Sequence, residues 1–192
     1  MPERGVFRGS AARGYATATN APLRVDSTTN QLKIIPGGTG TTEYVIPVEQ
    51  PTVSGQAATV TLTQAQDGAT CYFDSAAGII YTLPAPVVGT TFTFVVTVSV
   101  TSNLDKVITS AGSVFLIGTL IGGNTASADA MLAFTATSTT AISIIQNSTG
   151  TNATGGLIGS WFSLKCISST LWLVTGGFIL AGTTFTTPFS AT

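Results

Sequence analysis

Strict alternation of side chains over residues 91–100 constrains the fold of this chain more than any other feature. Every second position carries a large apolar side chain: Phe92, Phe94, Val96, Val98 and Val100. The positions between them carry Thr91, Thr93, Val95, Thr97 and Ser99. A period of two places successive side chains on opposite faces of a β-strand, here one apolar face and one rich in hydroxyls. Because the run contains no glycine or proline, we expect it to form a strand in the interior of a sheet.

Composition extends this prediction to the whole chain. Only 8% of the 192 residues are charged, against about 25% in a typical soluble protein. Threonine and valine are abundant, whereas the residues that favour helices are scarce. One domain, or one domain with an arm, fits this length. The sequence therefore predicts an all-β protein.

Turn residues recur about every ten positions and divide the chain into roughly ten to twelve short strands. We expect an antiparallel β-sandwich, or a jelly-roll-like arrangement of two packed sheets, over residues 31–192. Asp67-Gly68 is typical of a hairpin turn before the next strand. A strand over residues 113–117 is expected to end at Gly118. Trp161 and Trp172 are both expected to close one end of the core.

Residues 1–30 differ in composition from the rest and predict an extended N-terminal arm. Four of the seven basic residues lie here among small side chains, at Arg4, Arg8, Arg13 and Arg24. Without apolar periodicity such a segment becomes ordered only against another surface. The arm could fold back on its own domain or lie on neighbouring subunits, and we favour the second. The expected contact residues are Arg4, Phe7, Arg8, Arg13 and Tyr15.

Side chains for catalysis or metal binding are sparse in this sequence. There is no histidine, the side chain whose ordinary pKa suits acid–base chemistry near neutral pH. The eight carboxylates are scattered, mostly beside turn residues, where we expect them to be solvated. We therefore expect no catalytic, metal-binding or cofactor-binding residues, and a protein that is not an enzyme. Cys71 and Cys166 could be two packed thiols or one disulfide, and the sequence leaves both open.

The charge balance also narrows the classes of partner. A net charge of −1 gives no overall field that would attract nucleic acid or a membrane surface. The longest apolar runs are about 8 and 11 residues and contain glycine, whereas a membrane-spanning helix needs about 20. We expect neither nucleic acid nor membrane as a partner.

Several stretches of the sequence resemble the β-rich accessory proteins of tailed-phage particles. The stretches are TLPAPVVGTTFTFVVTVSVTSN, VITSAGSVFLIGTLIGG, GGLIGSWFSLKCISSTLWLVTGGF and the TPFS tail. The opening APLRVDSTTNQLKIIPGGTGTTE is similar to small head proteins of cyanophage-type and other aquatic phages. The similarity runs from about Ala21 to the C-terminus. The motifs that carry this similarity are recurring glycine, threonine and tryptophan residues, and they contain no catalytic signature.

This resemblance implies a capsid decoration, or cement, protein on the outer surface of a virion. Such a protein binds the major capsid protein, often as a homotrimer, and holds neighbouring capsomers together against the pressure of the packaged DNA. The contact would combine a stiff β body with the arm, so that several weak contacts add up. The alternatives are a tail or fibre component of the same kind of particle and a carbohydrate-binding β-sandwich, for which exposed aromatic side chains would be the sign.

Overall fold

The computed structural model describes residues 23–25, 32–34, 44–46, 52–55, 58–102, 104–125, 131–147, 152–181 and 184–192. The chain divides into two compact units, Met1–Gln50 and Pro51–Thr192. The predicted boundary between an arm of residues 1–30 and a sandwich of residues 31–192 stays a prediction. Within the N-terminal unit, β1 (Leu23–Val25), β2 (Leu32–Ile34) and β3 (Tyr44–Ile46) form an antiparallel sheet. The expected arm of residues 1–30 otherwise lies outside the described residues.

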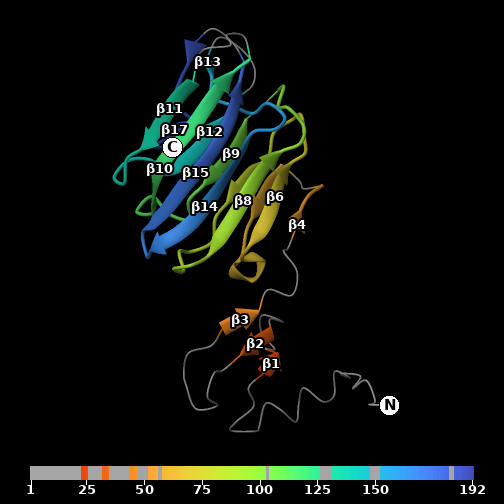
Figure 1. The fold of residues 1–192 in the computed structure, drawn as a ribbon, viewed down its shortest axis with the longest axis vertical. Coiled ribbons are helices and arrows are strands. Elements are labelled where there is room, and N and C mark those ends of the chain that lie inside the picture. Colours follow the sequence, from red (N-terminus) through yellow and green to blue (C-terminus); the bar gives the residue numbers. More distant parts are fainter. Residues whose placement is uncertain are drawn as a thin grey trace. The chain divides into compact units, whose positions relative to one another are not determined.

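The larger unit is built on two main sheets. Across the seven-stranded sheet the strands are β11 (Met131–Ala136), β10 (Phe115–Asn124), β15 (Leu171–Leu180), β14 (Trp161–Ser168), β8 (Thr91–Val96), β6 (Ala69–Phe73) and β4 (Thr52–Val53). Across the five-stranded sheet they are β17 (Phe189–Ser190), β12 (Ser143–Gln146), β9 (Asp105–Ile108), β7 (Ile80–Thr82) and β5 (Thr59–Thr61). A small pair, β13 (Asn152–Ala153) and β16 (Thr184–Phe185), and the 3-10 helix η1 (Gln64–Gln66) complete the described elements. Figure 1 shows the seven-stranded sheet as one broad layer of strands lying side by side.

The predicted all-β fold is confirmed, and the two main sheets together hold twelve strands. The pairing corrects one part of the prediction, because both sheets are mixed rather than antiparallel throughout. From β4 to β9 the chain alternates between the two sheets, and each strand from β6 onward lies parallel to the strand that comes two strands earlier. β10 and β15 are also parallel. The jelly-roll comparison stays a prediction.

This alternation explains why Asp67-Gly68 does not make a hairpin. Gly68 has a positive φ of 80°, as a tight turn requires. However, β5 lies in the five-stranded sheet and β6 in the seven-stranded sheet, so the turn carries the chain from one layer to the other. The carboxylate of Asp67 fixes the turn by accepting a hydrogen bond from the backbone N–H of Thr91, at 2.8 Å.

β8 confirms the alternating pattern on which the prediction was based. Phe92, Phe94 and Val96 are buried, and the positions between them are half-exposed. The strand ends at Val96, however, and Val98 is 38% exposed. β8 pairs with β14 on one side and with β6 on the other, so it lies inside the sheet as expected.

The core lies between the two sheets and is rich in aromatic rings. Phe94 stacks on Phe162 with ring centroids 5.0 Å apart, and packs edge-on against Tyr81 of the opposite sheet at 5.5 Å. Phe73 contacts the same tyrosine at 5.2 Å. Rings that bridge the two layers fix how the sheets pack, because each contributes a large buried area and a preferred geometry.

The longest strands, β10 and β15, run through glycines that the sequence placed at strand ends. Gly118 has a φ of 131°, and a Cβ built there would collide with the backbone carbonyl of Val174 on β15. Glycine is therefore required for the two strands to approach in register. The predicted strand end at Gly118 is wrong because this glycine permits close pairing.

Candidate interaction surface

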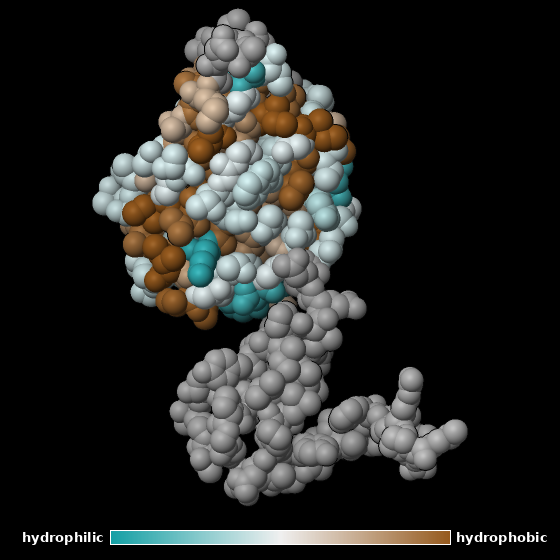
Figure 2. Space-filling model, in the orientation of Figure 1, coloured by the Kyte–Doolittle hydropathy of each residue, from teal (hydrophilic) through white to brown (hydrophobic). Residues whose placement is uncertain are grey.

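The outer face of the seven-stranded sheet presents the clearest chemical pattern among the described residues. We define this face by the side chains that alternate away from the core. Only one charged residue, Lys165, lies among them. Figure 2 shows pale, weakly polar side chains and brown, apolar ones on this unit. Strand register divides the face into three parts: a central row of hydroxyl side chains and one apolar region on either side of it.

A row of hydroxyl side chains crosses the middle of the face. Register pairs place one residue from each strand in the same line: Thr135, Thr119, Thr175, Ser163, Thr93, Thr70 and Thr52. We call this line the hydroxyl row. Thr93 and Ser163 share a hydrogen bond of 2.9 Å between their oxygens, and Thr119 and Thr135 share one of 3.3 Å. Neighbouring strands are about 4.8 Å apart, so the row is roughly 29 Å long.

On one side of the hydroxyl row lies a cluster that we call the apolar end, near the turn between β14 and β15. Its exposed members are Ile167 on β14, which is 42% exposed, and Val87 and Val88 in the turn before β8, which are 53% and 68% exposed. The backbone N–H of Gly89 donates to the carbonyl of Cys166 at 2.9 Å, which joins the turn before β8 to β14. Half-buried Phe115, Ile117, Leu171 and Leu173 continue the cluster over β10 and β15.

On the other side lies a line that we call the tryptophan row. It consists of Tyr72, Val95, Trp161, Gly177, Ile121 and Ala133 on six consecutive strands. Trp161 is 48% exposed and Ile121 is 47% exposed. The prediction that Trp161 and Trp172 both close the core is therefore correct only for Trp172, which is fully buried. The phase of β14 could have revealed this, because Trp161 alternates with Phe162 and lies in step with Ser163 and Lys165.

The structure describes only some of the residues that the sequence singled out. The predicted arm contacts, Arg4, Phe7, Arg8, Arg13 and Tyr15, lie outside the described residues and stay predictions. Cys71 and Cys166 are both free and buried, so the question of a disulfide is answered in favour of thiols. Burial raises the pKa of the Cys71 thiol to about 12 and also raises the pKa of Cys166. Both thiols are therefore protonated at neutral pH.

Asp105 is the one described carboxylate that departs from the expected solvated turn residue. It is fully buried, and its Oδ1 accepts a hydrogen bond from the backbone N–H of Ile79 at 3.0 Å. Its Oδ2 has no partner among the described residues. Burial, with a smaller contribution from the charge of Asp74, raises the pKa of Asp105 to about 7. The sequence does not indicate that Asp105 is buried, because its burial comes from the pairing of β7 with β9.

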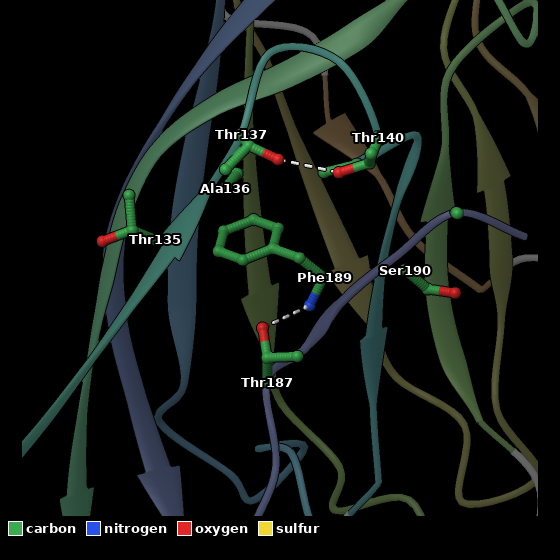
Figure 3. A pocket seen from close by; sticks show the side chains of 9 residues that line it. Thr135, Ala136, Thr137, Thr140, Thr187, Phe189 and Ser190 are labelled. Atoms are coloured by element: carbon green, nitrogen blue, oxygen red, sulfur yellow. Dashed lines mark hydrogen bonds between the residues drawn. The ribbon is translucent and has the colours of Figure 1, made fainter.

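A small pocket of about 180 Å³ lies where β11 and β17 meet at the edge of the sandwich. Figure 3 shows the Phe189 ring in the middle of the lining residues. Hydroxyls line the rim, but they are already bonded: Thr137 to Thr140 at 2.7 Å, and Thr187 to the backbone N–H of Phe189 at 3.3 Å. Each of these bonds is local, within the turn after β11 and the segment before β17.

No three or more histidine, cysteine, aspartate or glutamate side chains gather as a metal site among the described residues. In that part of the chain no helix has the length and apolar character needed to cross a membrane.

The fold and this surface define an all-β protein of two mixed sheets with a broad, nearly uncharged face. No protein-family model matches the chain, and no curated protein matches it closely enough to count as a relative.

Proposed function

We propose that this protein is a non-enzymatic decoration, or cement, protein of a viral capsid. It binds the major capsid protein on the outer surface of the virion and holds neighbouring capsomers together. The choice of partner follows from the sequence resemblance to accessory proteins of tailed phages. The contact surface follows from one structural observation, the apolar end, where exposed aliphatic side chains lie at one end of the seven-stranded sheet and in the turn beside it.

The apolar end has the composition of a protein-binding surface. The centres of protein interfaces are depleted in charged residues, and the described strands place a single charged side chain in the apolar end, Lys165 beside Leu173. Covering a half-exposed aliphatic side chain contributes about 1 kcal/mol. Val87, Val88 and Ile167 would then contribute about 3 kcal/mol, or a factor of roughly 150 in the dissociation constant.

A contribution of that size is too small for stable attachment by a single copy. Linking several copies raises the effective concentration of each further contact, so a homotrimer would attach firmly where a monomer would not. The arm, with Arg4, Phe7, Arg8, Arg13 and Tyr15, would add area on a neighbouring subunit. We therefore include a homotrimer and an arm contact in the proposal.

Cosedimentation with capsids that lack the protein tests the contact surface. The double variant Val88→Asp with Ile167→Asp places two charges in the apolar end, and we expect it to lose most of its occupancy. Ile158→Asp is the matched control, because Ile158 is 60% exposed and precedes the opposite end of β14. If the double variant decorates capsids as fully as the natural protein, the apolar end is not the contact.

Deletion of residues 1–20 tests the arm, and sedimentation equilibrium tests the trimer. We expect the truncated protein to decorate capsids at reduced occupancy, because part of the contact is missing. Full occupancy would remove the arm from the mechanism, and a protein that stays monomeric on and off particles would remove the trimer. Gold labelling of intact particles decides between the shell and the tail or fibre alternative.

A further inference from the structure

The exposed tryptophan of β14 lies over a gap in the neighbouring strand. Its register partner on β15 is Gly177, which has no side chain to cover the sheet. A Cβ built at Gly177 would lie 3.8 Å from Nε1 of Trp161, so the indole extends from β14 across β15. Trp161 is still 48% exposed in this position. The indole therefore forms an accessible aromatic surface that lies against β15.

The rest of the tryptophan row continues this surface across the strands. Tyr72 lies two strands away from Trp161, with Val95 between them. Because the indole extends over β15, away from β6, its ring lies about three strand spacings, roughly 14 Å, from the strand of Tyr72, which is close to the length of three sugar rings in an extended chain. Ile121, 47% exposed, borders Gly177 on its other side. Aromatic side chains at this spacing could each stack on a ring of one long ligand.

The hydroxyl row runs beside the tryptophan row, two residues away along each strand. Two residues of a strand span about 7 Å, so one ligand can touch both rows. The hydroxyls of Thr70 and Thr175 have no hydrogen-bond partner among the described residues. A hydroxyl offers one donor and two acceptor positions, so the bonded pairs Thr93–Ser163 and Thr119–Thr135 also retain capacity. Covering this row with an apolar surface would leave polar groups unsatisfied, at a cost.

We propose that the tryptophan row and the hydroxyl row together bind a neutral, extended polysaccharide that lies across the strands. The C–H faces of its sugar rings stack on Trp161 and Tyr72, because the face of an aromatic ring carries partial negative charge. Its hydroxyl groups bond to the hydroxyl row. This site uses a different half of the face from the apolar end, so it is independent of the capsid contact proposed above.

The charge of the face selects a neutral polymer over an acidic one. Lys165 is the one charged side chain on the described strands of the outer face, and it lies beyond the hydroxyl row, next to Leu173. An acidic polysaccharide is normally bound by several arginines or lysines, which pair with its negative groups. A neutral ligand needs no such partners.

Affinity gel electrophoresis of the full chain tests the proposal, with a neutral β-glucan, a galactomannan and a neutral xylan in the gel and alginate as the acidic comparison. We expect retardation by at least one neutral polymer and none by alginate. Titration with oligosaccharides of increasing length should shift the emission of Trp161, whereas Trp172 is buried and contributes a constant background. Affinity should rise with chain length until both aromatic side chains are covered.

Three variants connect binding to the site. Trp161→Ala should weaken binding about tenfold or more, and Trp161→Phe should retain most of it, because the ring remains. Gly177→Val should also weaken binding, because its side chain fills the space beside the indole while valine suits a strand. All three variants should attach to capsids as the natural protein does and should unfold at nearly the same temperature.

The proposal is overturned if no neutral polymer retards the natural protein, or if Trp161→Ala binds as tightly as the natural protein does. It is also overturned if Trp161→Ala stays folded but loses its attachment to capsids, because this half of the face would then be a protein interface. Loss of capsid attachment by the Val88→Asp and Ile167→Asp variant with retained polysaccharide binding would support both proposals. Retained attachment of that variant together with retained polysaccharide binding would contradict the capsid contact alone.

Discussion

The inner and outer faces of the seven-stranded sheet are made from alternate residues of the same strands, but their chemistry differs throughout. On the inner face, Phe94 stacks on Phe162, and Phe92 lies 6.1 Å from the ring of Trp172. On the outer face, the same strands carry the hydroxyl row, with apolar side chains exposed on either side of it. The inner face therefore determines whether the protein folds, whereas the outer face is available for binding. Substitutions on the two faces should have separable effects.

The two tryptophans give the largest contrast between the faces. Trp172 is fully buried, and we expect Trp172→Ala to lower the free energy of unfolding by about 4 to 5 kcal/mol. Trp161 is half-exposed, and Trp161→Ala should cost less than about 1 kcal/mol. Urea denaturation followed by far-ultraviolet circular dichroism measures both without relying on tryptophan emission. Equal losses of unfolding free energy in the two variants would contradict the assignment of stability to the inner face.

Trp172→Phe is the conservative control on the inner face. It keeps an aromatic ring and removes an indole N–H that has no hydrogen-bond partner among the described residues. It should therefore cost clearly less than Trp172→Ala.

Asp105 introduces pH dependence into the core. Its pKa is raised from 3.8 to about 7, so between these values the folded state keeps a proton that the unfolded state has lost. Stability should therefore fall as the pH rises from about 4 to about 7, by roughly 3 to 4 kcal/mol from this group. Asp105→Asn should remove this dependence in urea denaturation at pH 5 and pH 8. An unchanged pH dependence in the variant would exclude Asp105 as its source.

The hydroxyl row should contribute the least to stability. Thr93 and Ser163 share a hydrogen bond of 2.9 Å, and a double-mutant cycle with Thr93→Val and Ser163→Ala should give a coupling of about 0.5 to 1 kcal/mol. Ser163 also faces Thr175 in register, but no hydrogen bond joins their side chains. The cycle with Thr175→Val should therefore give a coupling near zero. Similar coupling in both cycles would mean that the hydrogen bond is not what links the pair.

Local patterns in the sequence predicted the elements whose structure depends on neighbours along the chain. The alternation in β8 was sufficient to assign its buried side chains, because a strand's period is a local property. The role of Gly118 in β10 cannot be predicted from local sequence, because it depends on how closely Val174 of β15 approaches. The same limit applies to Asp67-Gly68, whose flanking strands lie in different sheets.

The candidate surface depends even more on contacts between distant residues. The hydroxyl row cannot be recognised in the sequence, because its residues, from Thr52 to Thr135, are aligned only by the register of seven strands. Parallel pairing of β10 with β15 brings Thr119 beside Thr175, although 56 residues separate them in the chain. The outward direction of Trp161 could have been predicted from the phase of β14. The burial of Asp105 could not, because it requires knowing that β7 and β9 are neighbours.

Hydrogen–deuterium exchange of the protein, free and bound to capsids, tests most directly whether the outer face makes the contact. We predict slower exchange on binding in residues 86–91 and 165–173, which carry the apolar end. Exchange in the core strand β7 should not change, because it is already slow in the free protein. Unchanged exchange in both segments of the apolar end, with protection elsewhere, would contradict the account.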